Sequence, residues 1–385
     1  MRQEKGLRVL SLFDGMSCGQ IALRDLGIPI EVYYASEIDK FAIQQTQLNF
    51  PDTIQLGDVR NIDVDRLCDE VGEFDLLLAG SPCQSFSFAG KRVGMKTKEN
   101  IEILTLDQYI DLKDADFEFE GQSYLSWEFM RVLTALRRRN PNIMFLLENV
   151  EMGKKWETVL SEAVGIHGVH INSALVSAQN RKRIYWSNIR VREEGLFGYK
   201  YTDIPQPTDR GILLRDILEQ EVDEKYYLKD EVVRNLLTHK ERNKNAGNGF
   251  GAVFHEADGK MTDKCNCLTT ESQDIHLLFE DRNMIGSISR LLKNITDIKG
   301  KAHTLLASTY KGAGTNGMSL IEEDKGDGRY RIRRITPTEC ARLQTIPDWY
   351  IWDCSATHQY HLLGNGWTVE VIKHILSFMK LEDVL

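Results

Sequence analysis

The sequence predicts an α/β protein in which a mostly parallel β-sheet is covered by helices and joined to a smaller, loop-rich second domain. Short apolar runs alternate with helix-period stretches as far as about residue 190, which is typical of parallel strands connected by helices. This rhythm then stops, and residues 200–335 are rich in Gly, Asn, Thr, Lys and Asp. The length of 385 residues suits two domains.

The expected strands and helices can be placed in order along the chain. The expected strands are the apolar runs 7–13, 30–35, 76–79, 144–147 and 184–186. The expected helices cover residues around 21–26, 41–50, 127–139 and 369–376. Ligands of parallel sheets bind where the strands end, so polar residues at those ends are the candidate site residues.

Composition excludes several classes of protein. The chain is 42% hydrophobic and 27% charged, which is the balance of a globular protein rather than a disordered one. No window approaches ~18 consecutive apolar residues, so we expect no membrane span, and we see no secretory signal. The 7 cysteines are scattered, and we interpret them as reduced thiols of a cytoplasmic protein without a metal site.

The net charge of −9 would by itself argue against a nucleic-acid partner, because phosphate contacts need Lys and Arg. The charge is unevenly distributed, however. Residues 282–342 hold 12 Lys and Arg against 6 Asp and Glu, a net charge of +6, whereas both ends of the chain are acidic. This basic stretch keeps a nucleic-acid partner open.

Three motifs at strand ends contain candidate catalytic residues. Cys83 follows a buried strand at a place where a nucleophile would be presented, although a small buried thiol in a turn is the alternative. Glu148 closes the next apolar strand, where desolvation can raise the pKa of a carboxyl, unless this strand end is solvated. Alternation puts Arg181 and Arg183 on one face and Lys182 on the other, either as a clamp for an anion or base or as an exposed basic edge.

A second group of motifs indicates a nucleotide-like cofactor. The turn 13–19 offers small residues where the backbone could approach such a ligand. Glu37, at the end of the second strand, can accept hydrogen bonds from both ribose hydroxyls. Asp58, which follows the apolar pair Ile54 and Leu56, is a further acid at a strand end. No phosphate-binding Lys accompanies the turn, so an adenosine ligand without a pyrophosphate fits better than a dinucleotide or ATP.

In this order, the motifs closely resemble those of the cytosine-5 DNA methyltransferases. The resemblance spans residues 7–190 and 333–376, and it rests on these runs: Phe13–Gly19, Glu37, Gly57-Asp58, Pro82-Cys83-Gln84, Glu148-Asn149-Val150, Gln179-x-Arg181-x-Arg183, 334–344 and 363–366. It implies a Rossmann-like S-adenosylmethionine-dependent methyltransferase fold. The catalytic domain would comprise 1–195 and 335–385, and a target-recognition domain would comprise 196–334.

The resemblance also implies a role for each motif. Cys83 would add to carbon 6 of a flipped cytosine, Glu148 would donate to ring nitrogen 3, and Arg181 and Arg183 would hold the carbonyl oxygen. The residues that would bind S-adenosylmethionine, and its product S-adenosylhomocysteine, are Phe13, Asp14, Gly15, Glu37, Ile38, Asp58, Leu125, Asn365 and Gly366. The residues that would contact DNA from the catalytic loop are Gln84, Ser85 and Ser87.

The sequence departs from the family pattern in three places. Ser17 and Cys18 stand where many members have Gly, and Gly366-Trp367 replaces a frequent Ser/Ala-Val pair. The segment 91–122, after the nucleophile, is longer than usual, and residues 104–112 within it predict an inserted helix. We interpret this segment either as surface decoration or as an enlarged loop that closes on DNA.

The resemblance therefore implies a monomeric DNA (cytosine-5-)-methyltransferase of prokaryotic or phage type that acts on a specific duplex sequence. It could accompany a restriction endonuclease, act as an orphan enzyme or protect a phage genome. Three alternatives are an RNA (tRNA) cytosine-5 methyltransferase, a catalytically silent DNA-binding regulator and a nucleotide-dependent oxidoreductase. The long segment 200–335 favours DNA over RNA, the retained Cys83, Glu148 and Arg183 favour catalysis, and the absent pyrophosphate glycine pattern disfavours the oxidoreductase.

Overall fold

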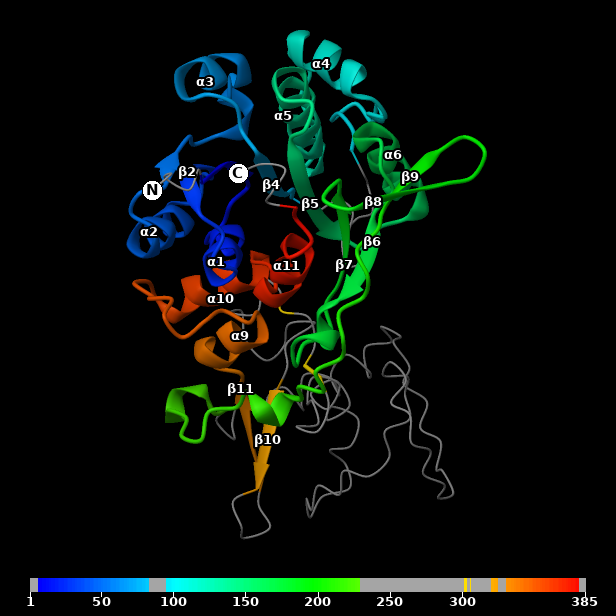
Figure 1. Ribbon diagram of the computed structural model, residues 1–385. Helices are drawn as coiled ribbons and strands as arrows, with labels where there is room; N and C mark the ends of the chain where they lie inside the picture. The colour runs from blue at the N-terminus through cyan, green and yellow to red at the C-terminus, as the bar shows by residue number, and fades with distance from the viewer. Residues whose placement is uncertain are drawn as a thin grey trace, which may run out of the picture.

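The computed structural model describes the sheet, its helices and part of the loop-rich region (Figure 1). The described residues are 6–82, 95–228, 301–302, 305, 320–324 and 330–380. The expected nucleophile Cys83 and the expected DNA contacts Gln84, Ser85 and Ser87 lie outside them.

A seven-stranded sheet with the order β3-β2-β1-β4-β5-β7-β6 forms the centre of the structure. The pairings among β1 to β5 are parallel, which confirms the prediction, whereas β7 runs antiparallel to both of its neighbours. The strands are β1 (Leu7–Leu12), β2 (Ile30–Ser36), β3 (Ile54–Gln55), β4 (Leu76–Gly80), β5 (Met144–Val150), β6 (Val169–Asn172) and β7 (Lys182–Ser187). Two short hairpins lie outside it, β8 (Val191–Glu194) with β9 (Tyr199–Thr202) and β10 (Leu320–Asp324) with β11 (Tyr330–Arg334).

Helices cover both faces of this sheet, with α1 and α11 together on one face and α3 and α5 together on the other (Figure 1). The helices are α1 (Cys18–Asp25), α2 (Lys40–Asn49), α3 (Val64–Val71), α4 (Leu106–Asp114), α5 (Ser126–Arg139), α6 (Lys154–Val164), α9 (Pro337–Leu343), α10 (Ala356–Asn365) and α11 (Val369–Leu376). The inserted helix predicted at 104–112 is confirmed as α4. Helices α3, α6, α9 and α10 have no counterpart among the predicted ones.

Side-chain alternation along each strand divides the core between the two faces. In β4, Leu76 and Leu78 belong to the cluster that contains α1 and α11, whereas Leu77 and Ala79 belong to the cluster that contains α3 and α5. All four side chains are fully buried. A strand buried on both faces has no solvent-facing position, which explains why it reads as a continuous apolar run in the sequence.

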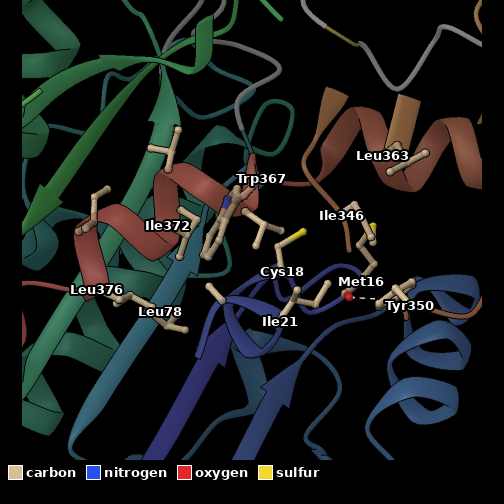
Figure 2. Packing of buried hydrophobic residues seen from close by; sticks show 14 of the residues in the cluster. Met16, Cys18, Ile21, Leu78, Ile346, Tyr350, Leu363, Trp367, Ile372 and Leu376 are labelled. Carbon is tan, nitrogen blue, oxygen red and sulfur yellow. Dashed lines mark hydrogen bonds between the residues drawn. The ribbon is translucent and has the colours of Figure 1, made fainter. Parts of the chain in front are cut away.

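The C-terminal segment completes this core by packing against the first turn of the chain (Figure 2). Trp367, directly before α11, lies so close to β4 that a Cβ on Gly80 would stand 2.6 Å from its Nε1. Tyr350 donates a hydrogen bond of 3.0 Å from its hydroxyl to the Met16 carbonyl. The unusual Trp367 is therefore a core side chain whose space depends on the absence of a side chain at Gly80.

The turn between β1 and α1 is held by a hydrogen-bonded carboxylate. Asp14 accepts hydrogen bonds from the Ser17 hydroxyl at 2.6 Å and the Tyr33 hydroxyl at 2.7 Å. Phe13 and Ser17 have positive φ angles of 56° and 65°, a conformation that costs a side-chain-bearing residue of order 1 kcal/mol or more. Burial raises the pKa of Asp14 to about 6, against the hydrogen bonds that lower it. These bonds stabilise a strained turn.

Some residues of the segment predicted as a target-recognition domain pack on the catalytic core. Ile204, Leu214 and Ile321 belong to the same buried cluster as α1 and α11. Arg333 and Glu339 form a fully buried ion pair of 2.9 Å at the start of α9. The described ends of the segment are thus anchored to the core, while the boundaries at 195 and 335 stay a prediction.

The contact between Gly80 and Trp367 predicts a large effect of adding a single methyl group. Gly80→Ala forces its Cβ against the indole, and overpacking of this kind lowers the free energy of unfolding by about 1–3 kcal/mol. Gly153→Ala is the control, since a Cβ there has no atom within 4 Å. Denaturant unfolding of both variants measures the difference, and equal stability would contradict the packing described here.

The half-buried carboxyl of Asp14 predicts a pH-dependent stability. Its pKa of about 6 in the folded protein lies above the ordinary value of 3.8, so the ionised form is disfavoured by folding. The stability of the wild type relative to Asp14→Asn should be highest below about pH 4 and fall by about 1–3 kcal/mol as the pH rises through 6. Urea unfolding across this range tests the expectation, which a pH-independent difference between the two proteins would refute.

Candidate functional site

Groups distant in sequence meet at the carboxyl edge of the parallel strands. Glu148 is near the end of β5 and pairs in register with Gly80, the last residue of β4. Because β7 runs antiparallel, it begins at the edge where β5 ends, and Arg183 pairs in register with Val150. The antiparallel direction of β7 therefore brings its basic first residues to the same edge as Glu148.

Glu148 and Arg183 form an ion pair at this edge. Arg183 Nε lies 2.9 Å from Glu148 Oε1, and Arg183 Nη1 donates to the Lys182 carbonyl at 2.8 Å. The two side chains retain 10% and 12% of their exposure, so the pair is nearly buried yet reachable from solvent. A charge-assisted contact of this kind fixes both groups in place before any ligand arrives.

Asn149 connects this pair to the end of β4. Its Nδ2 donates to the Ser81 hydroxyl at 2.9 Å, and that hydroxyl lies 3.0 Å from the hydroxyl of Ser126 at the start of α5. All three side chains are buried. The chain that leads toward Cys83 is thus fixed beside Glu148 as far as the described residues extend.

Arg181, directly before β7, has different partners from Arg183. Its guanidinium is buried and donates to the carbonyls of Leu305 at 3.0 Å and Gly366 at 2.9 Å, with longer contacts of 3.4 Å to Gly364. These bonds hold the loop at the end of α10. The structure therefore supports a positioning role for Arg181, whereas Arg183 faces Glu148.

Glu37 joins the ends of β1 and β2. Its Oε2 accepts from the Gly15 N–H at 2.8 Å, and its Oε1 accepts from the N–H groups of Ile38 and Asp39 at 2.7 and 2.9 Å. Gly15 has a φ of 58°, which glycine adopts without strain. Each carboxylate oxygen can accept more than one hydrogen bond, so Glu37 can orient the loop and still accept from a ligand hydroxyl.

Asp58 lies at the end of β3 and is held by Arg60. Arg60 Nη2 lies 2.5 Å from Asp58 Oδ2, and the carboxylate also caps the short 3-10 helix η1 (Val59–Asn61) by accepting from the Arg60 N–H. The Arg60 guanidinium lowers the pKa of Asp58, so this side chain is an ionised acceptor at neutral pH. An acceptor in this position suits an amino group of a ligand.

The residues around these acids fit an adenosine-bearing ligand. Ile38 is an apolar side chain left 69% exposed between Glu37 and Asp39, an uncovered surface on which a flat ring could pack. Phe13 and Leu125 are partly buried against the core cluster that also contains α3 and α5. An adenosine needs acceptors for its hydroxyl and amino groups and an apolar surface for its ring. Glu37, Asp58 and the exposed side chain of Ile38 offer both.

Gly366 lies against Cys18, the first residue of α1, and its neighbour Asn365 is exposed. A Cβ on Gly366 would stand 3.4 Å from the Cys18 sulfur and 3.1 Å from the Leu362 carbonyl. Burial raises the pKa of the Cys18 thiol to about 12, so this departure from the family pattern is an inert packing group. The structure thus brings the first and last predicted cofactor motifs together.

Several polar residues that support this site had no predicted role. Gln344 donates to the Leu363 carbonyl at 2.7 Å and accepts from the Thr368 hydroxyl at 2.9 Å, and Tyr33 donates to Asp14. Gln344 lies in one of the matched runs, which marks it as part of the pattern without giving its partner. Tyr33 is one of two adjacent tyrosines in a strand that also contains Glu31 and Ser36, so no signal in the sequence singled it out.

Two properties of the described residues concern other kinds of site. They contain no group of three or more His, Cys, Asp or Glu side chains arranged to hold a metal ion. None of their helices is long and apolar enough to cross a membrane. The described thiols are free: Cys18, Cys68, Cys340 and Cys354.

Comparison with known proteins agrees with this geometry. The chain is 27% identical to the orphan methyltransferase M.SPRI of Bacillus phage SPR, over 96% of this chain and 97% of that protein. It is 28% identical to the type II methyltransferase M.HpaII of Haemophilus parainfluenzae, over 94% of this chain and 86% of that one. Its fold is similar to the crystal structure of S. pombe Dnmt2 methyltransferase, with a TM-score of 0.61 and 16% identity over 99% and 100% of the two chains.

The model of the family described as C-5 cytosine-specific DNA methylase matches residues 7–380, which includes every strand and helix of the sheet described above. The match confirms both the resemblance seen in the sequence and the Rossmann-like methyltransferase fold. The chain therefore belongs to the C-5 cytosine-specific DNA methylase family and is a DNA (cytosine-5-)-methyltransferase.

Proposed function

We propose that this enzyme methylates carbon 5 of a cytosine within a specific duplex DNA sequence, after flipping the base and forming a covalent adduct with Cys83. The observation that carries the proposal is the 2.9 Å contact between Arg183 and Glu148 at the carboxyl edge of the sheet. Asn149 fixes the approach to Cys83 beside this pair. A nucleophile, a proton donor and a cationic clamp are the groups that the reaction needs.

The chemistry begins with a pyrimidine carbon that is a poor nucleophile. Addition of the Cys83 thiolate to carbon 6 breaks the 5,6 double bond and leaves carbon 5 electron-rich. Glu148, which pairs with Arg183 as a carboxylate in the free enzyme, must take up a proton for this step, and it then donates that proton to ring nitrogen 3, where negative charge develops. Arg183 holds the Glu148 carboxyl and the cytosine carbonyl oxygen, which fixes the ring against the nucleophile.

Carbon 5 would then take the methyl group of S-adenosylmethionine, which would leave as S-adenosylhomocysteine. The reaction ends when a base removes the proton from carbon 5 and the freed electron pair expels the Cys83 sulfur from carbon 6, which restores the 5,6 double bond. None of these atoms can be reached inside a stacked duplex, so the base must be extruded at a cost of a few kcal/mol. Gln84, Ser85 and Ser87 of the catalytic loop are the residues that we assign to the vacated space. Arg181 acts through the loop it holds and not on the base.

The cofactor site that we propose is built from the acids and apolar residues at the ends of β1, β2 and β3. When bound, S-adenosylmethionine supplies the electrophilic methyl group. Glu37 would hold its ribose and Asp58 its adenine amino group, while Phe13 and Ile38 would pack on the adenine. The remaining residues that we assign to this site are Asp14, Gly15, Leu125, Asn365 and Gly366.

We assign target recognition to residues 196–334 and catalysis to residues 1–195 and 335–385. The net charge of +6 over 282–342 supports a DNA contact there, because each phosphate neutralised by Lys or Arg strengthens binding. The relatives include proteins named as type II methyltransferases and proteins named as orphan methyltransferases. A type II role would require a restriction endonuclease with the same target sequence as partner.

Incubation with tritiated S-adenosylmethionine tests the proposal directly. We expect label in duplex DNA and none in transfer RNA, and Cys83→Ser should abolish the transfer because the thiolate is required. Label in RNA alone would instead identify an RNA methyltransferase, and label in neither would indicate a silent regulator. Full activity of Cys83→Ser would refute the covalent mechanism. Bisulfite sequencing of DNA from expressing cells would give the recognised sequence.

The role assigned to Glu148 predicts a defect in turnover without a defect in cofactor binding. Glu148→Gln keeps the shape of the side chain but removes the transferable proton, so kcat should fall by about 10²–10⁴-fold. Calorimetry with S-adenosylhomocysteine should give an unchanged Kd. Glu151→Gln, directly beyond β5, is the matched control and should keep its kcat. A Glu148→Gln variant with normal kcat would remove Glu148 from the mechanism.

A further inference from the structure

The segment between the catalytic loop and α5 is a fixed part of the fold. We call residues 95–122, the described part of the segment 91–122, the insertion. Met95, Thr97 and Ile103 within it are fully buried, and Thr97 pairs with Phe119 in an isolated β-bridge. Its helix α4 packs on α5 (Figure 1). A segment packed in this way is more than surface decoration, while its closure on DNA stays a prediction.

The insertion contacts α5 through a buried carboxylate, that of Glu128. Glu128 Oε1 accepts from the Tyr109 hydroxyl at 2.5 Å and from Lys113 Nζ at 2.6 Å, and both donors belong to α4. Glu128 Oε2 accepts from Arg131 Nε at 2.7 Å. Burial alone would raise the pKa of Glu128, but the hydrogen bonds from these three partners lower it below its ordinary value. The carboxylate is therefore ionised and is held by three donors inside the protein.

Arg131 continues this network toward the proposed cofactor site. Its Nη1 donates to the Ile62 carbonyl at 2.9 Å, and its Nη2 donates to the Val59 carbonyl at 3.0 Å. These carbonyls belong to η1 and the residue after it, and η1 is the turn that Asp58 caps. Glu128 also holds the Nε of this guanidinium. The position of Asp58 therefore depends on the position of α4 through Glu128 and Arg131.

A second contact runs in parallel with the first. Phe119 of the insertion stacks on Tyr124, two residues after it, with ring centroids 4.5 Å apart. The Tyr124 side chain also interacts with Arg60, the guanidinium that holds Asp58. Lys113 adds to the positive potential that keeps Asp58 ionised. Both routes from the insertion end at the same carboxylate.

We propose that Glu128 is a positioning residue through which the insertion sets the place of Asp58, and so the affinity of the enzyme for the adenine end of its cofactor. The proposal rests on the cofactor role assigned to Asp58 above. Tyr109 and Lys113 of α4 hold Glu128, Glu128 orients Arg131, and Arg131 holds the turn that begins at Asp58. The insertion is thus a support of the cofactor site.

A double-mutant cycle measured with S-adenosylhomocysteine tests this coupling. The Tyr109→Phe/Lys113→Met variant removes both α4 donors and leaves Arg131 on Glu128. We expect its Kd, from calorimetry, to rise by about tenfold, with kcat at saturating cofactor within about twofold of wild type. In an Asp58→Asn background the same two substitutions should change the Kd by less than about twofold, because the group that they position is already lost.

The controls separate positioning from general damage and from failure of the proposed function. Lys98→Met removes an exposed ion pair with Glu118 in the same insertion and should leave the Kd unchanged. In the double variant, Lys113→Arg in place of Lys113→Met should restore the affinity. If the double variant does not fold, the single substitution Tyr109→Phe is measured in its place. A wild type that binds no S-adenosylhomocysteine would overturn the cofactor assignment itself. An unchanged Kd, or equal losses in both backgrounds, would overturn only the role of Glu128.

Discussion

The closure of the catalytic domain depends on one buried guanidinium, that of Arg181. The last carbonyls of a helix have no partner within the helix, and they carry the negative end of its dipole. Arg181, directly before β7, donates to the carbonyls of Gly364 and Gly366 at the end of α10. A cation from the N-terminal part of the chain thus terminates a helix from the C-terminal part. Because Arg183 follows two residues later, the start of β7 both closes the domain and presents the clamp at its edge.

Much of the fold follows from local patterns in the sequence. The apolar runs at β1, β2, β4, β5 and β7 are visible because these strands are buried on both faces or nearly so. The direction of β7 is not visible, since a strand of the same composition can pair either way. Helix α9 is missing from the predicted helices, although its start has the sequence of a capping box, with Thr336 at the N-cap and Glu339 three residues later. Local chemistry therefore predicts elements well, and their pairing less well.

The site shows the same division between residue types and their partners. Resemblance to a family selected Glu148, Arg181 and Arg183, but it assigned both arginines to the base. The structure separates them, because the partner of Arg181 is a loop nearly two hundred residues later, which no spacing rule could supply. The tight approach of Trp367 to Gly80 likewise joins distant segments. Contacts between segments so far apart in sequence form only when the sheet is assembled. The sequence therefore predicts which residues belong to the site, and the structure is needed to identify their partners.

Three glutamates in the described residues are paired with arginines but differ in how deeply they are buried. Glu128, Glu148 and Glu339 are each held by an arginine, as a carboxylate removed from water must be. The side chains of Glu128 and Glu339 are fully buried, and their hydrogen bonds go to groups of the protein itself. Glu148 keeps a tenth of its exposure and lies at the edge where the parallel strands end. Since a carboxyl that exchanges protons with a ligand must be reachable, burial rather than pairing separates the group to which we assign a proton transfer from those that hold the structure in place.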